Sequence, residues 1–318
     1  MNISVITPVY NAAKFVTRAV ESALAHPEVA EVLLIEDGSP DNSLAVCQEL
    51  AAKYDKVRLL RHPNGENRGA GASRNLGMRK ASCEWIGFVD ADNFYLPHRF
   101  TKTAAVVNQN PDCEGVYEAI GIHVENEVAL KRWLDSNRFP PDKLITLTNK
   151  IQPENLGSAL ICGKYGYLTL DGLLIKRSVL QKVGFMAENL RLHQDTEWII
   201  RCALVAKLFP GNLDEAVAME GVHEGNRFSA PRPLSVEFRN RMMYWLSLFN
   251  WSKKHSSQSI QIQILERIIV YTKAHKYFRK FPRDRFPARL VRMARLLRLF
   301  RYPGIIKDCF KYKVKISL

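Results

Sequence analysis

The chain has 318 residues, of which 47% are hydrophobic and 25% are charged, as in ordinary globular proteins. This composition excludes intrinsic disorder and collagen-like repeats, and the length predicts one large domain with an appendage, or two domains. The sequence holds no run of about 18 apolar residues, and it begins with a strand-like segment rather than a basic, cleavable leader. We therefore expect neither a membrane-spanning nor a secreted protein.

Charge is distributed unevenly along the chain. Residues 231–318 hold 21 of the 46 Lys and Arg but 4 of the 32 Asp and Glu, so they carry +17, whereas residues 1–230 carry −3. This asymmetry predicts an anionic surface partner for the C-terminal region. The six cysteines include no Cys-x-x-Cys pair, which indicates reduced thiols in a cytoplasmic setting rather than disulfides or a zinc site.

The first hundred residues alternate between apolar, strand-like runs and helical patterns. Strands are predicted at residues 3–7, 31–35, 57–60 and 85–89, and helices at 12–24, 42–53 and 72–81. Strands separated by helices of this length indicate βαβ units and a parallel, doubly wound sheet.

The later regions follow different patterns. Residues 110–176 read as antiparallel additions and loops, followed by helices at 179–183 and 196–208. Pro231-Arg232-Pro233 marks a boundary, beyond which the chain is helical and basic. We therefore expect a catalytic domain at 1–230, with halves 1–110 and 111–230 for donor and acceptor, and a basic helical region at 231–318.

Polar clusters follow three of the predicted strands. In open α/β sheets ligands bind beyond the carboxyl ends of strands, so these clusters are the first candidates for a site. Asp90 and Asp92, separated by one residue after a buried strand, could hold a hard divalent cation that neutralises a diphosphate. A solvated turn is the alternative interpretation of this pair.

Two further residues suggest nucleotide binding. Asp37 could accept a hydrogen bond from the imide of a uracil or guanine, with Tyr10 against the base; the alternatives are a type I turn and a sheet-edge aromatic residue. Gly69-Ala70-Gly71 is a weak match to a dinucleotide-binding loop, because Arg74 occupies the third glycine position and the loop follows the third strand. The sequence also holds no phosphate-loop lysine motif.

These motifs together resemble glycosyltransferase family 2, whose members have the GT-A fold. The resemblance is dense from Ile3 to Asn93 and rests on four motifs in order: Thr7-Pro8-Val9-Tyr10-Asn11, Glu36-Asp37-Gly38-Ser39, Ala72-Ser73-Arg74-Asn75-Leu76-Gly77 and Asp90-Ala91-Asp92. It continues more loosely through Gln194-Asp195-Thr196-Glu197-Trp198 to about residue 230. The implied fold is α/β, with a mixed, mostly parallel, Rossmann-like sheet flanked by helices and followed by the basic helical extension.

The resemblance also implies roles for individual residues. Asp92 would ligate Mn²⁺ or Mg²⁺, and Asp195 matches the family's general base, although it is also a good helix N-cap. This chain departs from the family's pattern at two positions. It has Glu36 where the family often has Asp, and Asn93 where the family often has a third acid, so that one possible metal ligand is missing. The implied donor-binding residues are Thr7, Pro8, Tyr10, Asp37, Arg74 and Asp90.

For the remaining candidate site residues, a functional role and a purely structural role are both open. His223 lies where relatives often carry a histidine near the donor phosphates, so a metal or phosphate contact and a structural role are both open, with Arg227 as a weaker phosphate clamp. Trp133, Tyr167 and Asp171 are candidate acceptor contacts, while the two aromatic rings could equally belong to the core.

The basic C-terminal region contains an amphipathic pattern. From Pro287 onward, apolar residues occupy one helical face, and the opposite face carries Arg289, Arg292, Arg295 and Arg298. Such a cationic helix suits an anionic membrane surface. A helix packed on the catalytic domain is the alternative; nucleic acid is not expected, because no RNA-binding module is visible.

The sequence as a whole predicts a metal-dependent, inverting glycosyltransferase. It would move a sugar from a nucleotide-sugar donor, a UDP-sugar in the first instance, to a hydroxyl of a glycan or lipid-linked acceptor. This reaction would serve cell-surface polysaccharide or lipopolysaccharide assembly at the cytoplasmic face of the membrane. The alternative is a non-catalytic GT-A-like protein whose basic tail binds an anionic membrane or nucleic acid; intact Asp90, Asp92 and Asp195 argue against it.

Overall fold

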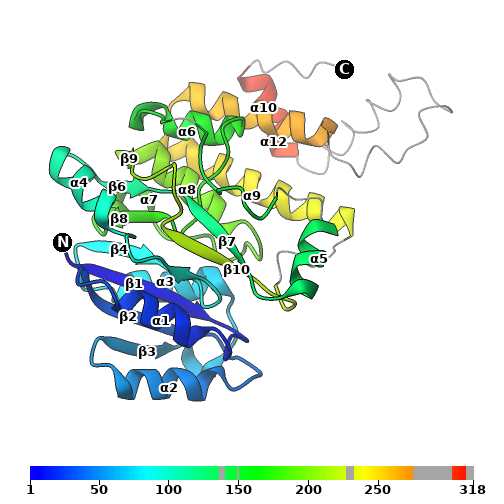
Figure 1. Cartoon of the computed structure of the whole chain (residues 1–318). Coiled ribbons are helices and arrows are strands. Elements are labelled where there is room, and N and C mark those ends of the chain that lie inside the picture. The colour runs from blue at the N-terminus through cyan, green and yellow to red at the C-terminus, as the bar shows by residue number, and fades with distance from the viewer. Residues whose placement is uncertain (136–139, 149, 227–232, 275–302, 313–318) are drawn as a thin grey trace. The chain divides into compact units, whose positions relative to one another are not determined.

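The chain forms two compact units, Met1–Pro231 and Arg232–Leu318. The computed structural model describes residues 1–135, 140–148, 150–226, 233–274 and 303–312 (Figure 1). Within these ranges, every helix is too short or too polar to span a lipid bilayer.

The first unit is built on a mixed sheet whose seven described strands have the order β3-β2-β1-β4-β8-β6-β9. β8 is antiparallel to its neighbours β4 and β6, and the other pairs are parallel. β1 and β2 are buried along almost their whole length, as expected for strands covered on both faces. The predicted fold class is therefore confirmed. The strands span β1 Ile3–Val9, β2 Val29–Glu36, β3 Val57–Arg61, β4 Trp85–Phe88, β6 Gly115–Tyr117, β8 Leu173–Lys176 and β9 Leu208–Pro210.

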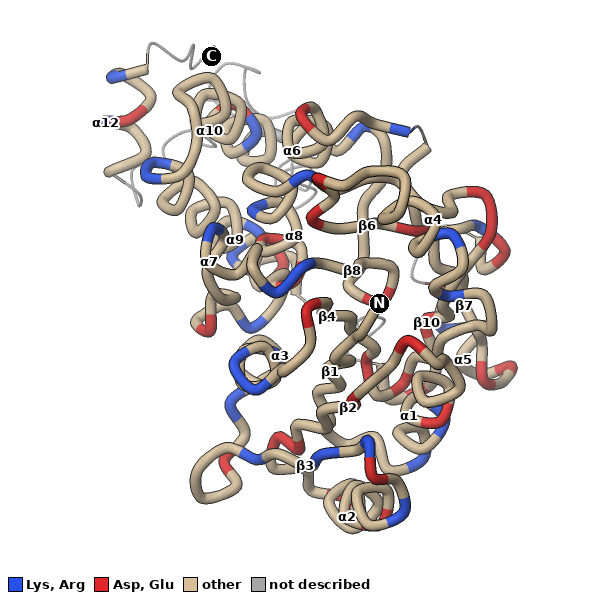
Figure 2. Tube along the Cα trace, turned by 90° about the vertical axis from the view of Figure 1, so that its left-hand side faces the viewer, with Lys and Arg blue, Asp and Glu red and all other residues tan. Residues whose placement is uncertain are grey.

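Helices cover both faces of the β1–β4 half of this sheet. α1 (Val16–Leu24) and α2 (Ser43–Lys53) lie on one face and α3 (Ala70–Lys80) on the other (Figures 1 and 2). Right-handed crossovers require this arrangement, because the chain moves outward from β1 to β3 and returns to β4 on the other side of β1. α3 packs directly on β1 because residue 77 is glycine: a Cβ there would lie 2.5 Å from Cγ2 of Ile6.

The middle of the chain differs from expectation in two ways. It contains two helices that the pattern did not predict, α5 (Glu127–Asp135) and α6 (Pro153–Cys162). The expectation of antiparallel additions is right for β8, which pairs antiparallel with both β4 and β6, but β6 also pairs in parallel with β9 on its other side. Its partner lies almost a hundred residues away, so the local pattern carries no sign of the pairing. Among the described residues of this unit, the remaining α-helices are α4 Thr101–Gln109, α7 Val179–Val183 and α8 Gln194–Val205, and a short 3₁₀-helix spans Pro63–Gly65.

A small second sheet lies on the α1 side of the main sheet (Figure 1). β10 (Ala218–Val222) is its central strand, antiparallel to β5 (Phe94–Tyr95) and parallel to β7 (Ile120–Val124). β5 follows the Asp90–Asp92 loop directly, and the chain leaving β10 carries His223. This sheet therefore brings residues from two distant parts of the sequence to the same place.

The described part of the second unit is helical, as predicted. It consists of α9 (Leu234–His255), α10 (Gln258–Ala274) and α12 (Pro303–Lys311). α9 packs on α10, and Lys253 of α9 forms an ion pair of 2.7 Å with Asp308 of α12. The cationic helix predicted from Pro287, with its four arginines, lies outside the described residues, as does Arg227.

Candidate active site

The carboxyl ends of β1, β2 and β4 form one edge of the main sheet. Thr7 is paired in register with Leu34 of β2, and Ile6 with Phe88 of β4. The backbone N–H of Asp37 donates to the carbonyl of Val9 at 2.9 Å, which extends this alignment beyond the strands. The three polar clusters that follow these strands are therefore neighbours in space.

Asp37 is buried, with 2% of its surface exposed, and it holds the loop that leads into α3. Its two carboxylate oxygens accept the backbone N–H groups of Arg68 and Gly69, each at 2.8 Å. Its own carbonyl accepts the side-chain amide of Asn67 at 2.9 Å. The side chain predicted to contact a nucleotide base thus holds the loop that leads into α3.

The remaining residues of the predicted base pocket line this same edge. Thr7 is fully buried, and its hydroxyl has no hydrogen-bond partner among the described residues. Pro8 is half-buried, and Tyr10 is 45% exposed just beyond the end of β1. Glu36 has a structural role instead. Its carboxylate accepts a hydrogen bond from the backbone N–H of Ser39 and forms an ion pair with Arg61.

Arg74 and Asp90 form an ion pair that links α3 to the loop after β4. Nη2 of Arg74 lies 2.5 Å from Oδ1 of Asp90, and the Arg74 side chain is 5% exposed. Burial raises the pKa of Asp90, the carboxylates of Asp92 and Asp195 act in the same direction, and Arg74 opposes them. Burial alone would lower the pKa of Arg74, but Asp90, Asp195 and Asp171 outweigh it and raise the pKa.

Asp171, a predicted acceptor contact, lies beneath the Asp90–Asp92 loop and is 5% exposed. Its Oδ1 accepts the backbone N–H of Asp90 at 3.0 Å and the side-chain amide of Asn93 at 2.9 Å. Burial, together with the charge of Asp90, raises the pKa of Asp171 to about 7. Asn93 also accepts the backbone N–H of Gly221 at 2.9 Å, so it ties this loop to β10.

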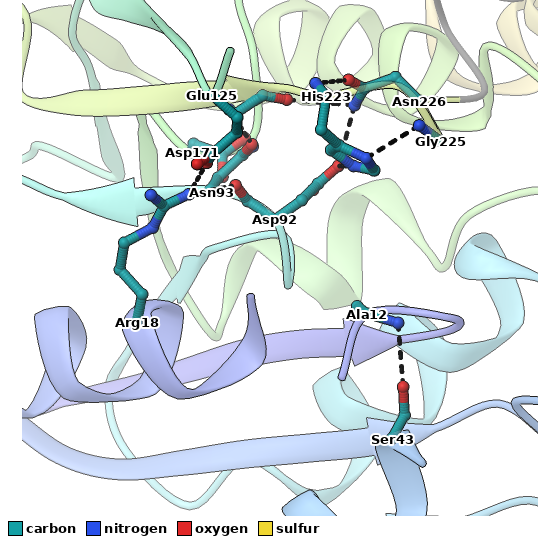
Figure 3. A network of polar contacts seen from close by, with 11 residues as sticks. Ala12, Arg18, Ser43, Asp92, Asn93, Glu125, Asp171, His223, Gly225 and Asn226 are labelled. Carbon is teal, nitrogen blue, oxygen red and sulfur yellow. Dashed lines mark hydrogen bonds and ion pairs between the residues drawn. The ribbon is translucent and has the colours of Figure 1, made fainter. Parts of the chain in front are cut away.

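Asp92 receives two hydrogen bonds on one carboxylate oxygen. Oδ2 lies 3.3 Å from Nε2 of His223 and 3.1 Å from Nδ2 of Asn226 (Figure 3). From the α1 side, Arg18 pairs with Glu125 and lies 3.5 Å from the carbonyl of Asp92. The loop is thus supported from both sides, while the Asp92 side chain stays 30% exposed.

The residues present fit a divalent cation held together with a substrate. Among the described residues there is no group of three or more His, Cys, Asp and Glu that could hold a metal by themselves. Oδ1 of Asp92, however, accepts no hydrogen bond from any described residue, and a carboxylate oxygen is a hard ligand. Magnesium-type sites commonly combine one or two protein carboxylates with substrate phosphates. Asp92 would be the protein's contribution to such a site.

Asp195 lies in the first turn of α8, and three hydrogen bonds tie α8 to the end of α7 and the residues that follow it. Trp198 Nε1 donates to the carbonyl of Gly184 at 2.9 Å, and Arg201 donates to those of Val183 and Phe185. A Cβ at Gly71 would lie 3.1 Å from Cγ of Gln194, so the starts of α3 and α8 are close. Oδ1 of Asp195 accepts the N–H of the next residue, Thr196, at 2.7 Å. The N-cap of α8 is His193, without a side-chain capping bond, so the alternative of Asp195 as the N-cap is wrong.

The two aromatic acceptor candidates differ in exposure. Trp133 is 1% exposed and belongs to the hydrophobic core, so its ring faces are covered; Tyr167 is 41% exposed. Sequence reasoning did not single out Asn226 or assign a task to Asn93, yet both bond within the site. The available signal for Asn226 was its spacing from His223, since residues three apart close a turn, seen here as the 3.2 Å bond from Asn226 N to His223 O.

Comparisons with known proteins agree with this architecture. The family model described as Glycosyl transferase family 2 matches residues 4–184. An uncharacterised glycosyltransferase of Nostoc sp. is 30% identical over 234 residues, covering 71% of this chain and 66% of the relative. The succinoglycan biosynthesis protein ExoU of Rhizobium meliloti is 29% identical over 201 residues, covering 63% of this chain and 56% of the relative. The matched part therefore spans less than two thirds of the length of these relatives.

Solved structures show the same fold at low identity. A crystal structure of residues 1–349 of S. aureus TarS superposes with a TM-score of 0.62 and 17% identity, covering 89% of this chain and 76% of that fragment. The mannosyltransferase PcManGT from Pyrobaculum calidifontis gives a TM-score of 0.51 and 14% identity, covering 98% of this chain and 84% of the other. The chain therefore belongs to glycosyltransferase family 2 and has the GT-A fold.

Proposed function

We propose that this chain is a metal-dependent, inverting glycosyltransferase that uses a nucleotide-sugar donor. The observation that carries the proposal is the gathering of Asp92, the Arg74–Asp90 pair and Asp195 at the carboxyl edge of the sheet. Asp92 offers one carboxylate oxygen without a described partner, as a cation-binding residue requires. The buried, unpartnered hydroxyl of Thr7 and Nε of Arg74 are further polar groups that a bound nucleotide would satisfy.

The proposed chemistry assigns a task to each of these residues. When bound, Mn²⁺ or Mg²⁺ supplies positive charge to the leaving diphosphate. Asp92 holds that cation, and Asp90 is oriented by Arg74 toward the ribose and sugar. Asp195 accepts the proton of the acceptor hydroxyl while the oxygen of that hydroxyl attacks the anomeric carbon and the nucleoside diphosphate leaves. One displacement with a single base inverts the anomeric configuration.

The donor is proposed to be a UDP-sugar and the acceptor a glycan or lipid-linked hydroxyl. TarS, which shares the fold, has been solved with UDP and with UDP-GlcNAc, whereas PcManGT has been solved with GDP-Man and Mn²⁺. The relative named for succinoglycan biosynthesis supports a role in making cell-surface polysaccharide. Tyr167, which is exposed, is the stronger of the two aromatic acceptor candidates.

The donor proposal is tested by thermal unfolding with UDP, GDP, CDP and dTDP, each with and without Mn²⁺. A ligand at 100 times its dissociation constant adds about 2.7 kcal/mol to the unfolding free energy, a rise in Tm of roughly 5–10 °C for a unit of this size. We expect UDP to stabilise the protein strongly only with Mn²⁺, and Asp92→Asn to remove that dependence. Asp55→Asn, an exposed change next to α2, is the control. Stabilisation by no nucleotide would refute the proposal.

The basic second unit is proposed to attach the enzyme to the cytoplasmic face of an anionic membrane. Its net charge of +17 supports this, because each Lys or Arg near such a surface contributes about 1 kcal/mol. Replacing Arg289, Arg292, Arg295 and Arg298 by Glu in the full chain should abolish flotation with phosphatidylserine vesicles at low salt. Undiminished flotation of that variant would contradict the proposal.

A further inference from the structure

A short turn after β10 closes over Asp92. The backbone N–H of His223 donates to Oδ1 of Asn226, and the backbone N–H of Asn226 donates to the carbonyl of His223 at 3.2 Å. Nδ2 of Asn226 donates both to the carbonyl of Gly221 and to Oδ2 of Asp92, each at 3.1 Å. The amide of Asn226 is therefore fixed at both of its ends before it reaches Asp92.

The same turn fixes which nitrogen of the His223 ring carries the proton. The backbone N–H of Gly225 points to Nδ1 of His223 at 3.1 Å, so Nδ1 must act as an acceptor and bears no hydrogen. The proton of the neutral ring is then on Nε2, the nitrogen 3.3 Å from Oδ2 of Asp92. Phe15 packs against this ring, with 4.4 Å between centroids, and restrains its orientation (Figure 3 shows the ring between Asp92 and Gly225).

This hydrogen-bond pattern conflicts with His223 as a metal ligand. A ligating Nε2 must have a free lone pair, so the ring proton would move to Nδ1 and face the N–H of Gly225. Two donors would then point at each other within a turn that is held by four other hydrogen bonds. A ligand role would therefore require this turn to open.

We propose that His223 and Asn226 are positioning residues that occupy Oδ2 of Asp92 and leave Oδ1 for the cation, and that His223 does not bind the metal. Two donors on one oxygen fix the rotation of the carboxylate. Support of a ligating carboxylate by hydrogen bonds is a general feature of metal sites, and its loss typically lowers metal affinity about 10–100-fold. This inference rests on the proposed function only in taking Asp92 as the cation-binding residue.

The first test needs no metal. Long-range ¹H–¹⁵N NMR spectra of the full-length protein, assigned with a His223→Gln variant, report the tautomer of the ring. We expect Nε2–H for the neutral ring, and an Nδ1–H tautomer would overturn the proposal. Because this measurement requires neither Mn²⁺ nor nucleotide, it separates failure of the positioning role from failure of the proposed enzymatic function.

The second test uses Mn²⁺ with UDP and electron paramagnetic resonance. We expect Asn226→Leu, which removes the amide donor at similar size, to weaken Mn²⁺ binding about 10-fold or more. His223→Gln, which keeps an amide donor, should retain affinity within about threefold of wild type, a loss well short of the roughly 10–100-fold range. Asn110→Leu is the matched control, because it removes a comparable 2.8 Å side-chain bond from the residue after α4 to the carbonyl of Val106 and should leave affinity unchanged.

The spin-echo spectrum of bound Mn²⁺ decides whether His223 is a ligand. We expect the nitrogen modulation of the Mn²⁺ spin echo to be the same in unlabelled protein and in protein whose histidines carry ¹⁵N. A label-dependent modulation that disappears in His223→Gln, or unchanged Mn²⁺ affinity in Asn226→Leu, would overturn the proposal. Thermal unfolding of each variant identifies any general loss of folding.

Discussion

Gly221 lies in β10 at the point where the loop that carries Asp92 passes over the second sheet. A Cβ built on Gly221 would be 2.1 Å from the carbonyl oxygen of Asp92, while its backbone N–H donates to Asn93 at 2.9 Å. Glycine is needed here for close approach. The change to test is Gly221→Ala.

The size of the effect follows from that distance. Carbon and oxygen atoms that are not bonded rarely approach within about 3 Å, so the Asp92 backbone must move by roughly 1 Å to admit the methyl group. Such overpacking costs typically about 1–3 kcal/mol of folding stability. A displacement of about 1 Å at a catalytic group can lower the rate about 100-fold. The displaced loop is also the one that positions the proposed cation.

Three measurements on Gly221→Ala check this reasoning. Tm should fall by roughly 2–4 °C for each kcal/mol lost. Stabilisation by UDP with Mn²⁺ should shrink, and sugar transfer should fall about 100-fold. Gly304→Ala is the control, because a Cβ at Gly304 meets no atom within 4 Å. Wild-type Tm and wild-type metal-dependent stabilisation in Gly221→Ala would refute the argument.

Three further predictions, made with four substitutions, concern other parts of the first unit. Asp195→Asn should lower sugar transfer by about 10²–10⁴-fold while UDP-induced stabilisation persists; unchanged transfer would exclude a general base at this position. Asp171 keeps its proton to about pH 7 when folded but releases it near its ordinary pKa of 3.8 when unfolded, so it lowers stability as pH rises through that window. Asp171→Asn keeps an acceptor oxygen but has no proton to release. In urea unfolding, the stability of this variant relative to wild type should therefore increase from pH 4 to pH 7. A constant difference in unfolding free energy over this pH range would contradict this. Arg99→Met breaks the fully buried 2.6 Å pair with Glu118 and should cost about 3–5 kcal/mol in denaturant unfolding. Lys53→Met breaks the exposed pair with Glu21, which water and salt screen, and should cost much less. Equal losses in these last two variants would refute the role of burial.

Much of the site was accessible from the sequence because its residues follow strands. The apolar runs before Thr7, Asp37 and Asp90 predict parallel strands, and parallel strands deliver their carboxyl ends to one edge. The order of four short motifs indicates the family as well, and the family model matches residues 4–184 of the chain. Local patterns of alternating strands and helices thus determined the fold class and the place of the candidate site.

The same patterns did not determine what each polar side chain contacts. In the sequence, Asn93 stands out only because the family often has an acid at this position, but in the folded chain it joins Asp171 to Gly221. Asp37 holds a loop about thirty residues further along the chain, and Asn226 reaches Asp92 across more than a hundred. Such pairs carry no local periodicity.

The sequence by itself therefore determined the fold class, the edge of the sheet where the candidate site lies and the identity of the acidic residues there. The tertiary structure decided how those residues are held: β10 enters the second sheet beside β5, and this pairing brings His223 and Asn226 onto Asp92. The physical reason is one of distance along the chain. Strand and helix propensities act over a few neighbouring residues, whereas the hydrogen bonds that orient Asp92 exist only after strands β5 and β10, which lie far apart in sequence, have paired.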